Sequence, residues 1–451
     1  MIQLRPYQDA MMNTAAGHYR SGVRAVLMQL ATGGGKSLLG ASVAKRSLQR
    51  GNGSFWVTHR SELLRQVSGA FTALDVPHGI VAAGRKHGKE SVQICSIDTL
   101  RRRLDKIERP KLVIWDEAHH IGAATWKHVY QWAGDAWHLG LSATPVRSDG
   151  AGLGEFFQRM VQGPSVAELI EQGYLSRYRI FAPSTVDLSG VHTVAGDYNR
   201  GELAQVMDKP AIVGNAVAHY RKFADGKKCL VFAVSIEASK HLAQGFRDAG
   251  YIAMHCDGMT DDTLREQMLR DFANGPLQVL CSVSLFTEGL DVVGVECVIE
   301  ARPTQSLGLY LQMIGRGLRT APGKSECILL DMAGNWHRHG LPDDPREWTL
   351  DGTRTGRKAK PAEVAVRVCP QCLAVNRARV MRCGECGHEF VIEGREVLEL
   401  EGELTEVTKP RVKLEIGKLE TFEQVKEYGK MKKYHHRWAE RYWQARERAR
   451  Q

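Results

Sequence analysis

The chain has 451 residues and a mass of 50.2 kDa, with 43% hydrophobic and 25% charged residues. This composition is typical of globular proteins and excludes a disordered or fibrous chain. No apolar run of about 18 residues occurs, so no membrane-spanning helix is expected. The N-terminus lacks the basic-then-apolar pattern of a secretory signal. The sequence therefore predicts a cytoplasmic protein of about three domains.

The charge balance favours a polyanionic partner without identifying one. Lysine and arginine number 61 against 51 acidic residues, a net charge of +10. Residues 421–451 hold nine basic side chains against four glutamates, which is half of that surplus. The remainder is interpreted as spread thinly over the body of the chain, as solvated surface charge usually is.

Two series of short, branched apolar segments predict buried parallel strands, because each is followed by turn signals. The first series is Val26–Leu30, Ser54–Thr58, Gln93–Ser96, Leu112–Trp115 and Leu139–Ser142. The second is Cys229–Ala233, Ala253–Cys256, Gln278–Ser282, Cys297–Glu300 and Cys327–Leu330. Helical-period segments alternate with them. The pattern predicts two successive α/β domains, over residues 1–178 and 179–340.

Composition changes after Leu341. Residues 341–366, rich in Pro, Gly, Asp and basic residues, predict a linker. A four-cysteine segment at 367–392 and a Glu-rich connector at 393–420 follow. The basic, aromatic segment 421–451 predicts a helical tail.

A glycine-rich loop after the first strand predicts a phosphate site. Thr32, Gly33, Gly34, Gly35, Lys36 and Ser37 stand between that strand and a helix start. Glycine backbones can wrap a phosphate at a helix N-terminus, where the dipole favours anions. Lys36 would neutralise the β- and γ-phosphates, and Ser37 would bind Mg²⁺. The strict P-loop pattern fails because Leu30 replaces its first glycine.

Carboxylates and arginines at later strand and helix ends complete this chemistry. Asp116 and Glu117 end an apolar strand about 80 residues after the loop, where one would hold the metal and the other would face the attacking water. Arg316 and Arg319 are three residues apart, so they share one helical face. Aimed at a nucleotide on the first domain, they would stabilise γ-phosphate charge as arginine fingers.

In this order the motifs resemble the superfamily 2 helicases of DEAH type, over residues 1 to about 335. The resemblance implies two tandem RecA-like domains that bind ATP and Mg²⁺. It further implies that Arg5 and Gln8 read adenine, that Gly289 and Asp291 lie at the ribose, and that His119, Ser142, Thr144 and Gln312 couple hydrolysis to movement. The segments Arg302–Gln312, Gly315–Lys324 and Leu330–Asn335 resemble the RadD group of bacterial DNA-repair helicases, whose C-terminal cysteine-rich part is longer.

The same resemblance places a nucleic-acid strand. Residues His59, Arg60, Ser96, Ser235 and Thr287 match strand-binding motifs, although a lone serine such as Ser96 or Ser235 would otherwise be interpreted as a helix cap. Small hydroxyls and an arginine hold phosphates without reading bases, so binding should tolerate sequence and respond to salt. These residues do not separate DNA from RNA; the RadD resemblance favours DNA, single-stranded or branched.

Four cysteines predict a structural zinc ribbon. Cys369 and Cys372, and then Cys383 and Cys386, form two CxxC pairs ten residues apart, and Zn²⁺ prefers four thiolates in a tetrahedron. Disulfides are disfavoured in an intracellular chain, and His388 is interpreted as a bystander. The ribbon could contact DNA or a partner protein, or only stabilise the region.

The tail carries an aromatic stripe at helical spacing, formed by Met431, Tyr434, Trp438, Tyr442 and Ala445. Either the stripe stacks on bases of DNA, or it packs an amphipathic helix on the core. The tail is also a second candidate surface for protein partners.

The sequence therefore predicts an ATP-dependent superfamily 2 DNA helicase or translocase that acts in DNA repair, recombination or phage replication. Two alternatives stay open at this point. One is an RNA-directed or duplex-translocating ATPase, which would share every ATP residue. The other is a non-catalytic nucleic-acid-binding scaffold, against which the intact set Lys36, Asp116, Glu117, Arg316 and Arg319 argues.

Overall fold

The computed structural model divides into two compact units, Met1–Val391 and Ile392–Gln451, which are described separately. Within them the structure describes residues 3–59, 61–85, 88–147, 150–182, 191–194, 197–207, 210–283, 285–286, 294–351, 366–377, 380–390, 421–431, 439–440 and 443–444. None of the helices in these ranges is long and apolar enough to cross a membrane.

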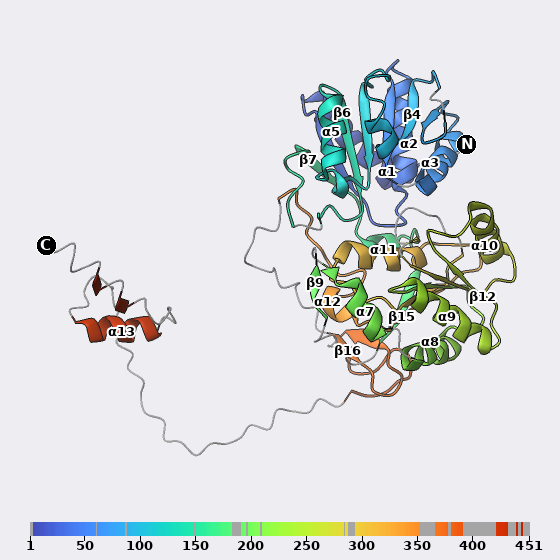
Figure 1. Ribbon diagram of the computed structural model, residues 1–451, viewed down its shortest axis with the longest axis vertical. Helices are drawn as coiled ribbons and strands as arrows, with labels where there is room; N and C mark the ends of the chain where they lie inside the picture. Colours follow the sequence, from blue (N-terminus) through green and yellow to red (C-terminus); the bar gives the residue numbers. More distant parts are fainter. Residues whose placement is uncertain are drawn as a thin grey trace. The chain divides into compact units, whose positions relative to one another are not determined.

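The first lobe of the larger unit is a parallel sheet in the order β3-β4-β2-β5-β6-β1-β7. Its strands are β1 (Ala25–Gln29), β2 (Ser54–Thr58), β3 (Gly79–Val81), β4 (Val92–Ser96), β5 (Leu112–Asp116), β6 (Trp137–Ser142) and β7 (Arg159–Gln162). Its helices are α1 (Pro6–Arg20), α2 (Lys36–Leu48), α3 (Ser61–Ala73), α4 (Ile97–Arg101) and α5 (Ala124–Ala133), with a short 3₁₀ helix at Ala118–His120. The central strands are buried along their length because helices cover both faces (Figure 1).

The second lobe repeats this design with a parallel sheet in the order β12-β13-β11-β14-β15-β8. Its strands are β8 (Arg177–Phe181), β11 (Cys229–Phe232), β12 (Ala253–Cys256), β13 (Val279–Ser282), β14 (Cys297–Glu300) and β15 (Glu326–Asp331). Its helices are α6 (Val166–Glu171), α7 (Arg200–Met207), α8 (Pro210–Phe223), α9 (Ile236–Asp248), α10 (Asp262–Asn274), α11 (Leu307–Gly317) and α12 (Asn335–His339). A two-stranded antiparallel pair joins β9 (Thr193–Val194) to β10 (Asp197–Tyr198).

The predicted fold class is confirmed: both sheets are parallel, and every predicted strand is present with ends within two residues of expectation. Three strands of the two sheets were missed, and all are edge strands. β3 has only three residues, while β7 and β8 carry exposed polar side chains instead of an apolar run. Because β8 begins at Arg177, the second sheet starts before the predicted domain boundary at 178/179.

The predicted linker begins with an ordered segment. Residues 341–351 leave the second lobe, and the Leu350 carbonyl accepts hydrogen bonds from the amides of Leu153 and Gly154 in the first lobe, at 2.8 and 2.9 Å. A small antiparallel pair, β16 (Val366–Val368) and β17 (Val375–Arg377), then opens the cysteine segment.

The smaller unit contains α13 (Phe422–Met431). The ring of Phe422 meets that of Trp443 edge to face at 6.0 Å, so a helix and a packed aromatic pair are present in the predicted tail. The stripe residues Tyr434, Trp438, Tyr442 and Ala445, and the acidic connector 393–420, lie outside the described residues.

Candidate functional site

The glycine-rich loop connects β1 to α2, and its three glycines occupy positions where a side chain would be strained or would clash. Gly33 and Gly35 have φ of 85° and 87°, the left-handed region that favours glycine. A Cβ on Gly34 would lie 2.7 Å from Cγ of Leu30, so the residue that breaks the strict P-loop pattern fills the space beneath this glycine. The loop therefore exposes backbone at the N-terminus of α2, where Lys36 and Ser37 follow, and suits an anion.

The predicted adenine residues take two different positions. Arg5 lines the cavity beside the loop. Gln8 is 1% exposed, and its amide nitrogen donates to the carbonyls of Gly34 and Gly35 at 3.3 and 3.2 Å. Its amide oxygen accepts from the Arg5 backbone at 2.9 Å. In this structure the Gln8 side chain therefore fixes the backbone of the glycine-rich loop through hydrogen bonds.

The carboxyl end of β5 brings Asp116 and Glu117 to the same cavity. Burial and the neighbouring Glu117 carboxylate raise the pKa of Asp116 to about 7, against the opposing effect of Lys36. Burial lowers the pKa of Lys36, while both carboxylates act to raise it. These three groups therefore form one electrostatic unit, in which the charge of each depends on the others.

The second lobe closes the cavity with residues from α11 and the turn after it. Arg316 and Gln312 are each 3% exposed, and together with Arg319 they line the cavity. The cavity holds about 420 Å³. Its described lining consists of Arg5, Thr32, Gly33, Gly35, Lys36, Ser37, Leu38, Leu63, Gln66, Ala70, Asp116, Glu117, Tyr174, Gln312, Arg316, Arg319 and Thr320. The predicted lysine, carboxylates and arginines thus meet in one place.

The predicted coupling residues join the two lobes behind this cavity. Nδ1 of His119 lies 3.2 Å from Oγ of Ser142 and 3.5 Å from a Glu117 oxygen. The Ser142 hydroxyl oxygen also accepts from the Thr144 amide at 3.2 Å. A Cβ on Gly308, in the first turn of α11, would lie 3.0 Å from the Thr144 hydroxyl. A continuous chain of contacts therefore runs from Glu117 to the second lobe.

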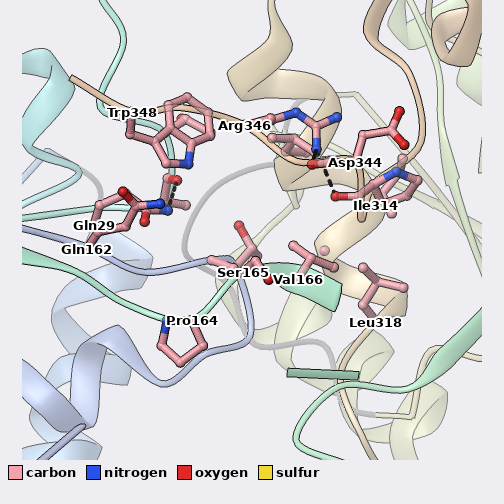
Figure 2. Close-up of a pocket in the computed structure, with 17 residues that line it drawn as sticks. Gln29, Gln162, Pro164, Ser165, Val166, Ile314, Leu318, Asp344, Arg346 and Trp348 are labelled. Atoms are coloured by element: carbon pink, nitrogen blue, oxygen red, sulfur yellow. Dashed lines mark hydrogen bonds between the residues drawn. The ribbon is translucent and has the colours of Figure 1, made fainter. Parts of the chain in front are cut away.

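A second, smaller cavity of about 60 Å³ (Figure 2) shares Thr32 with the first cavity and is also lined by Thr144. From the segment after the second lobe, Pro342, Asp344, Arg346 and Trp348 line it. Trp348 lies beside Gln29 and Gln162, and Arg346 lies across from Ser165. The Arg346 guanidinium donates to four carbonyls, those of His339, Leu341, Pro342 and Asp344. The start of the predicted linker is therefore a fixed strap against both lobes.

The predicted strand residues are only partly described. His59 follows β2, and its ring lies 4.7 Å from the ring of His120, which in turn lies 4.3 Å from the ring of His119 in a tilted arrangement. Ser96 precedes α4 and makes no side-chain cap bond. Ser235 accepts from the Ala238 amide at 3.1 Å and so caps α9, as the alternative interpretation of a lone serine has it. Arg60, Thr287, Gly289 and Asp291 lie outside the described residues.

The four cysteines come together in a geometry that fits zinc. The Sγ atoms of Cys369, Cys372, Cys383 and Cys386 all lie within 4.8 Å of one another, with two pairs at 3.6 and 3.5 Å. Zn–S bonds of about 2.3 Å in a tetrahedron require sulfurs about 3.8 Å apart. Such separations are far too long for disulfides. His388 stands outside the cluster and packs its ring against Phe390 at 5.7 Å.

The cysteine segment packs into the second lobe and is not an isolated module. Cys369, Cys383, Ala374 and Phe390 belong to a buried cluster with Phe181 of β8. The Ala182 amide donates to the Leu373 carbonyl at 3.3 Å, and Arg179 forms ion pairs with Glu385 and Glu326. Metal binding at the cysteines should therefore support the edge of this sheet.

Sequence reasoning missed several cavity residues. Tyr174, in the segment between the lobes, lies under the Arg5 guanidinium at 4.6 Å and meets Tyr7 edge to face at 5.4 Å. The Tyr7 hydroxyl donates to the Gly34 carbonyl at 2.7 Å. No spacing signal marked either tyrosine, since their relation to the loop is set by tertiary packing.

Known proteins resemble both lobes. Residues 1–147 match the family of the type III restriction enzyme res subunit, and residues 208–321 match the helicase conserved C-terminal domain. A 51.5 kDa protein of a Lactococcus phage is 35% identical over 393 residues, covering 86% of this chain and 84% of the phage protein. The Saccharomyces cerevisiae protein IRC3, named as an ATP-dependent helicase, is 29% identical over 357 residues. That match covers 73% of this chain and about half of IRC3, 51%.

Solved structures share the fold. A fragment of an HsdR subunit of a type I restriction enzyme from Vibrio vulnificus superposes with a TM-score of 0.61 at 18% identity, over 75% of this chain and 66% of that one. At this identity the likeness establishes the arrangement of the two lobes and no more.

Proposed function

This chain belongs to the superfamily 2 helicases, ATP-hydrolysing enzymes that bind nucleic acid, and we propose that its track is DNA and its role repair, recombination or phage replication. The observation that carries the proposal is the cavity where Lys36, Asp116 and Glu117 of one lobe face Arg316 and Arg319 of the other. A nucleotide in such a site would touch both lobes, so its binding and release would change the contact between them.

We assign the first-lobe residues to the phosphates. Backbone amides of the glycine loop and the Lys36 ammonium hold the β- and γ-phosphates. Ser37 and Asp116 would hold Mg²⁺, which would neutralise phosphate charge. Glu117, turned by its left-handed backbone (φ 48°), orients and deprotonates the attacking water. The bound cation would also keep Asp116 ionised, which burial and Glu117 alone oppose.

We assign the second-lobe arginines to the charge that develops on the γ-phosphoryl group. Once phosphate leaves, Arg316 and Arg319 lose their ligand, and the contact between α11 and the first lobe is weakened. Thr144 and Ser142 transmit this change because they connect Gly308 of α11 to His119 and Glu117. A strand held by both lobes would then be moved by cycles of closing and opening.

Two observations support DNA as the track. The family model over residues 1–147 bears the name of a restriction-enzyme subunit. The segments Arg302–Gln312 and Gly315–Lys324 resemble the RadD group of DNA-repair helicases. The match to a phage protein over most of its length supports phage replication among the three proposed roles.

The test is the ATPase rate with single-stranded DNA, duplex DNA, forked DNA and RNA of equal length. We expect single-stranded or forked DNA to stimulate turnover most, and Lys36→Ala to abolish it in every case. Stimulation by RNA or duplex alone would establish the alternative of an RNA-directed or duplex-translocating ATPase. Wild-type rates in Lys36→Ala would refute the site itself.

A further inference from the structure

A basic surface lies on the first lobe, beside the predicted strand contact Ser96. Between residues 101 and 111 the chain has six basic and two acidic residues, a surplus of +4 out of +10 for the whole chain. The charge of the lobes is therefore locally concentrated, where the sequence interpretation had it thinly spread. The exposed members, which we call the α4 basic surface, are Arg85, Arg101, Arg102, Lys106, Arg109 and Lys111.

These cations lack acidic partners. Among the described residues, Arg101, Arg102 and Lys106 form no ion pair. Helix α10 shows the contrast, since Arg265 pairs with Asp262 at 3.2 Å and Arg270 with Glu266 at 4.0 Å. Uncompensated like charges repel one another and favour a polyanion that neutralises them.

Internal contacts hold the α4 basic surface in place. Arg103, the half-buried member of the run, donates to the Arg85 carbonyl at 2.9 Å and to the Ala82 carbonyl at 3.5 Å. This draws the loop after β3 against the segment after α4. Because α4 has five residues and rises about 1.5 Å for each, Arg101 lies within about 8 Å along the helix from Ser96.

A hollow borders the same segment and offers groups that suit bases. It holds about 510 Å³ and is lined by Leu104, Asp105, His128, Gln131 and Trp132. The Arg109 guanidinium lies 6.0 Å from the Trp132 ring, whose partner on the protein side is Phe55. Cations that follow a backbone, next to an aromatic ring and hydrogen-bonding side chains, are the composition of sites for single strands.

We propose that the α4 basic surface binds the phosphate backbone of a single nucleic-acid strand that continues from Ser96 across the first lobe. The inference rests on the proposed function, because it extends that function's track beyond the motif residues. The strand's phosphates face Arg101, Arg102 and Lys106, and its bases turn toward the hollow at Trp132. Contacts of this kind add affinity without sequence preference.

The experiment measures the salt dependence of binding to a fluorescent 30-nucleotide oligo(dT) in the absence of nucleotide. The test variant is Arg101→Gln/Arg102→Gln/Lys106→Gln. The matched control, Arg50→Gln/Lys222→Gln/Lys240→Gln, removes three exposed cations elsewhere and has the same net charge. Each phosphate contact contributes about 0.7 to the slope of log K against log salt for a single strand, so the test variant should lose about 2.

We expect the control variant to keep the wild-type slope. Equal slopes for the test and control variants would overturn the inference. A larger loss on a 30-base-pair duplex than on oligo(dT) would overturn the assignment to a single strand. Failure of the proposed function is seen separately, as absence of DNA-stimulated ATP hydrolysis in the wild type, since the binding assay contains no nucleotide. Melting curves of both variants exclude unfolding as the cause.

Discussion

Each lobe carries two carboxylates at the carboxyl ends of its parallel strands, and the two pairs have opposite surroundings. Asp116 and Glu117 end β5 beside a cavity of about 420 Å³ that Lys36 shares. Glu300 and Asp331, which end the neighbouring strands β14 and β15, are in register and are 1% and 0% exposed. A buried carboxylate at a strand end therefore does not by itself indicate catalysis; the cavity and the cation do.

The sealed pair of the second lobe is partly satisfied from within the protein, and among the described residues one Glu300 oxygen, Oε1, is buried without a hydrogen-bond partner. Asp331 accepts from the amides of Ala333 and Trp336 at 2.9 and 2.8 Å, and Asn335 donates to one Glu300 oxygen at 3.3 Å. Burial, and then the nearby Asp331, raises the pKa of Glu300 well above its ordinary value. These surroundings therefore favour the protonated form of Glu300, whereas the pKa of Asp116 is raised to about 7.

The largest expected effect is a difference in ATP turnover between variants of Glu117 and Glu300. Glu117→Gln should lower ATP turnover by about 10²- to 10⁴-fold, because the proposed general base is lost. Glu300→Gln, which preserves shape in a region without access to the cavity, should leave turnover at the wild-type rate. Steady-state ATPase assays on both variants check this, and a severe loss in Glu300→Gln would break the comparison between the lobes.

The next effect concerns zinc at the four cysteines, which should stabilise the second lobe. Removal of zinc by a chelator should lower the free energy of unfolding by several kcal/mol, because the four thiolates repel one another and the buried cluster at Phe181 loosens. Metal analysis should give one zinc per chain, and thermal melts with and without chelator measure the effect. Cys256→Ala, in the same lobe but outside the ribbon, should keep the response to chelator, and Cys369→Ser should lose it.

A smaller effect follows from the raised pKa of Glu300. The native state keeps a proton there that the unfolded chain releases above its ordinary pKa of 4.5. The contribution of Glu300 to the free energy of unfolding is therefore fully present below pH 4.5. It declines as the pH rises toward the native pKa, by at most about 1.4 kcal/mol per pH unit. Glu300→Gln should remove this decline and be the more stable protein at pH 8.

Denaturant titrations between pH 4.5 and 9 measure the slope for each variant. Glu347→Gln, which changes an exposed carboxylate, should follow the wild-type curve. Parallel curves for wild type and Glu300→Gln would show that Glu300 is ionised in the native state, and the contrast with Asp116 would disappear.

The sequence predicted what continuous apolar runs and fixed motif spacing determine. The ten predicted strands are mostly buried, so their apolar composition marks them, and the loop, Asp116 and Arg316 lie at strand or helix ends at countable positions. What depends on packing between distant segments was not predictable. Tyr174 reaches the cavity through the Leu175 segment, which pairs with Arg319, and the Glu300–Asp331 contact arises only when β14 and β15 lie side by side.

The smallest effect distinguishes the two knuckles of the ribbon. In each, the residue after the second cysteine donates its amide to the first cysteine's carbonyl, at 2.9 Å for Leu373 and 3.0 Å for Gly387. Both have a left-handed backbone, with φ of 64° and 71°. This conformation costs a residue with a Cβ about 1–2 kcal/mol, so Gly387→Leu should destabilise the zinc-loaded chain by that amount.

Leu373→Gly relieves the same strain, at the cost of about 0.5–1 kcal/mol for the greater freedom of glycine in the unfolded chain. Among the described residues its side chain packs against neither buried cluster of the second lobe. We therefore expect a gain of up to about 1 kcal/mol in the free energy of unfolding, measured in denaturant at constant zinc. If Leu373→Gly instead lost as much unfolding free energy as Gly387→Leu, contacts of the Leu373 side chain would have to outweigh its backbone strain. The first CxxC knuckle of the ribbon would then stabilise the second lobe.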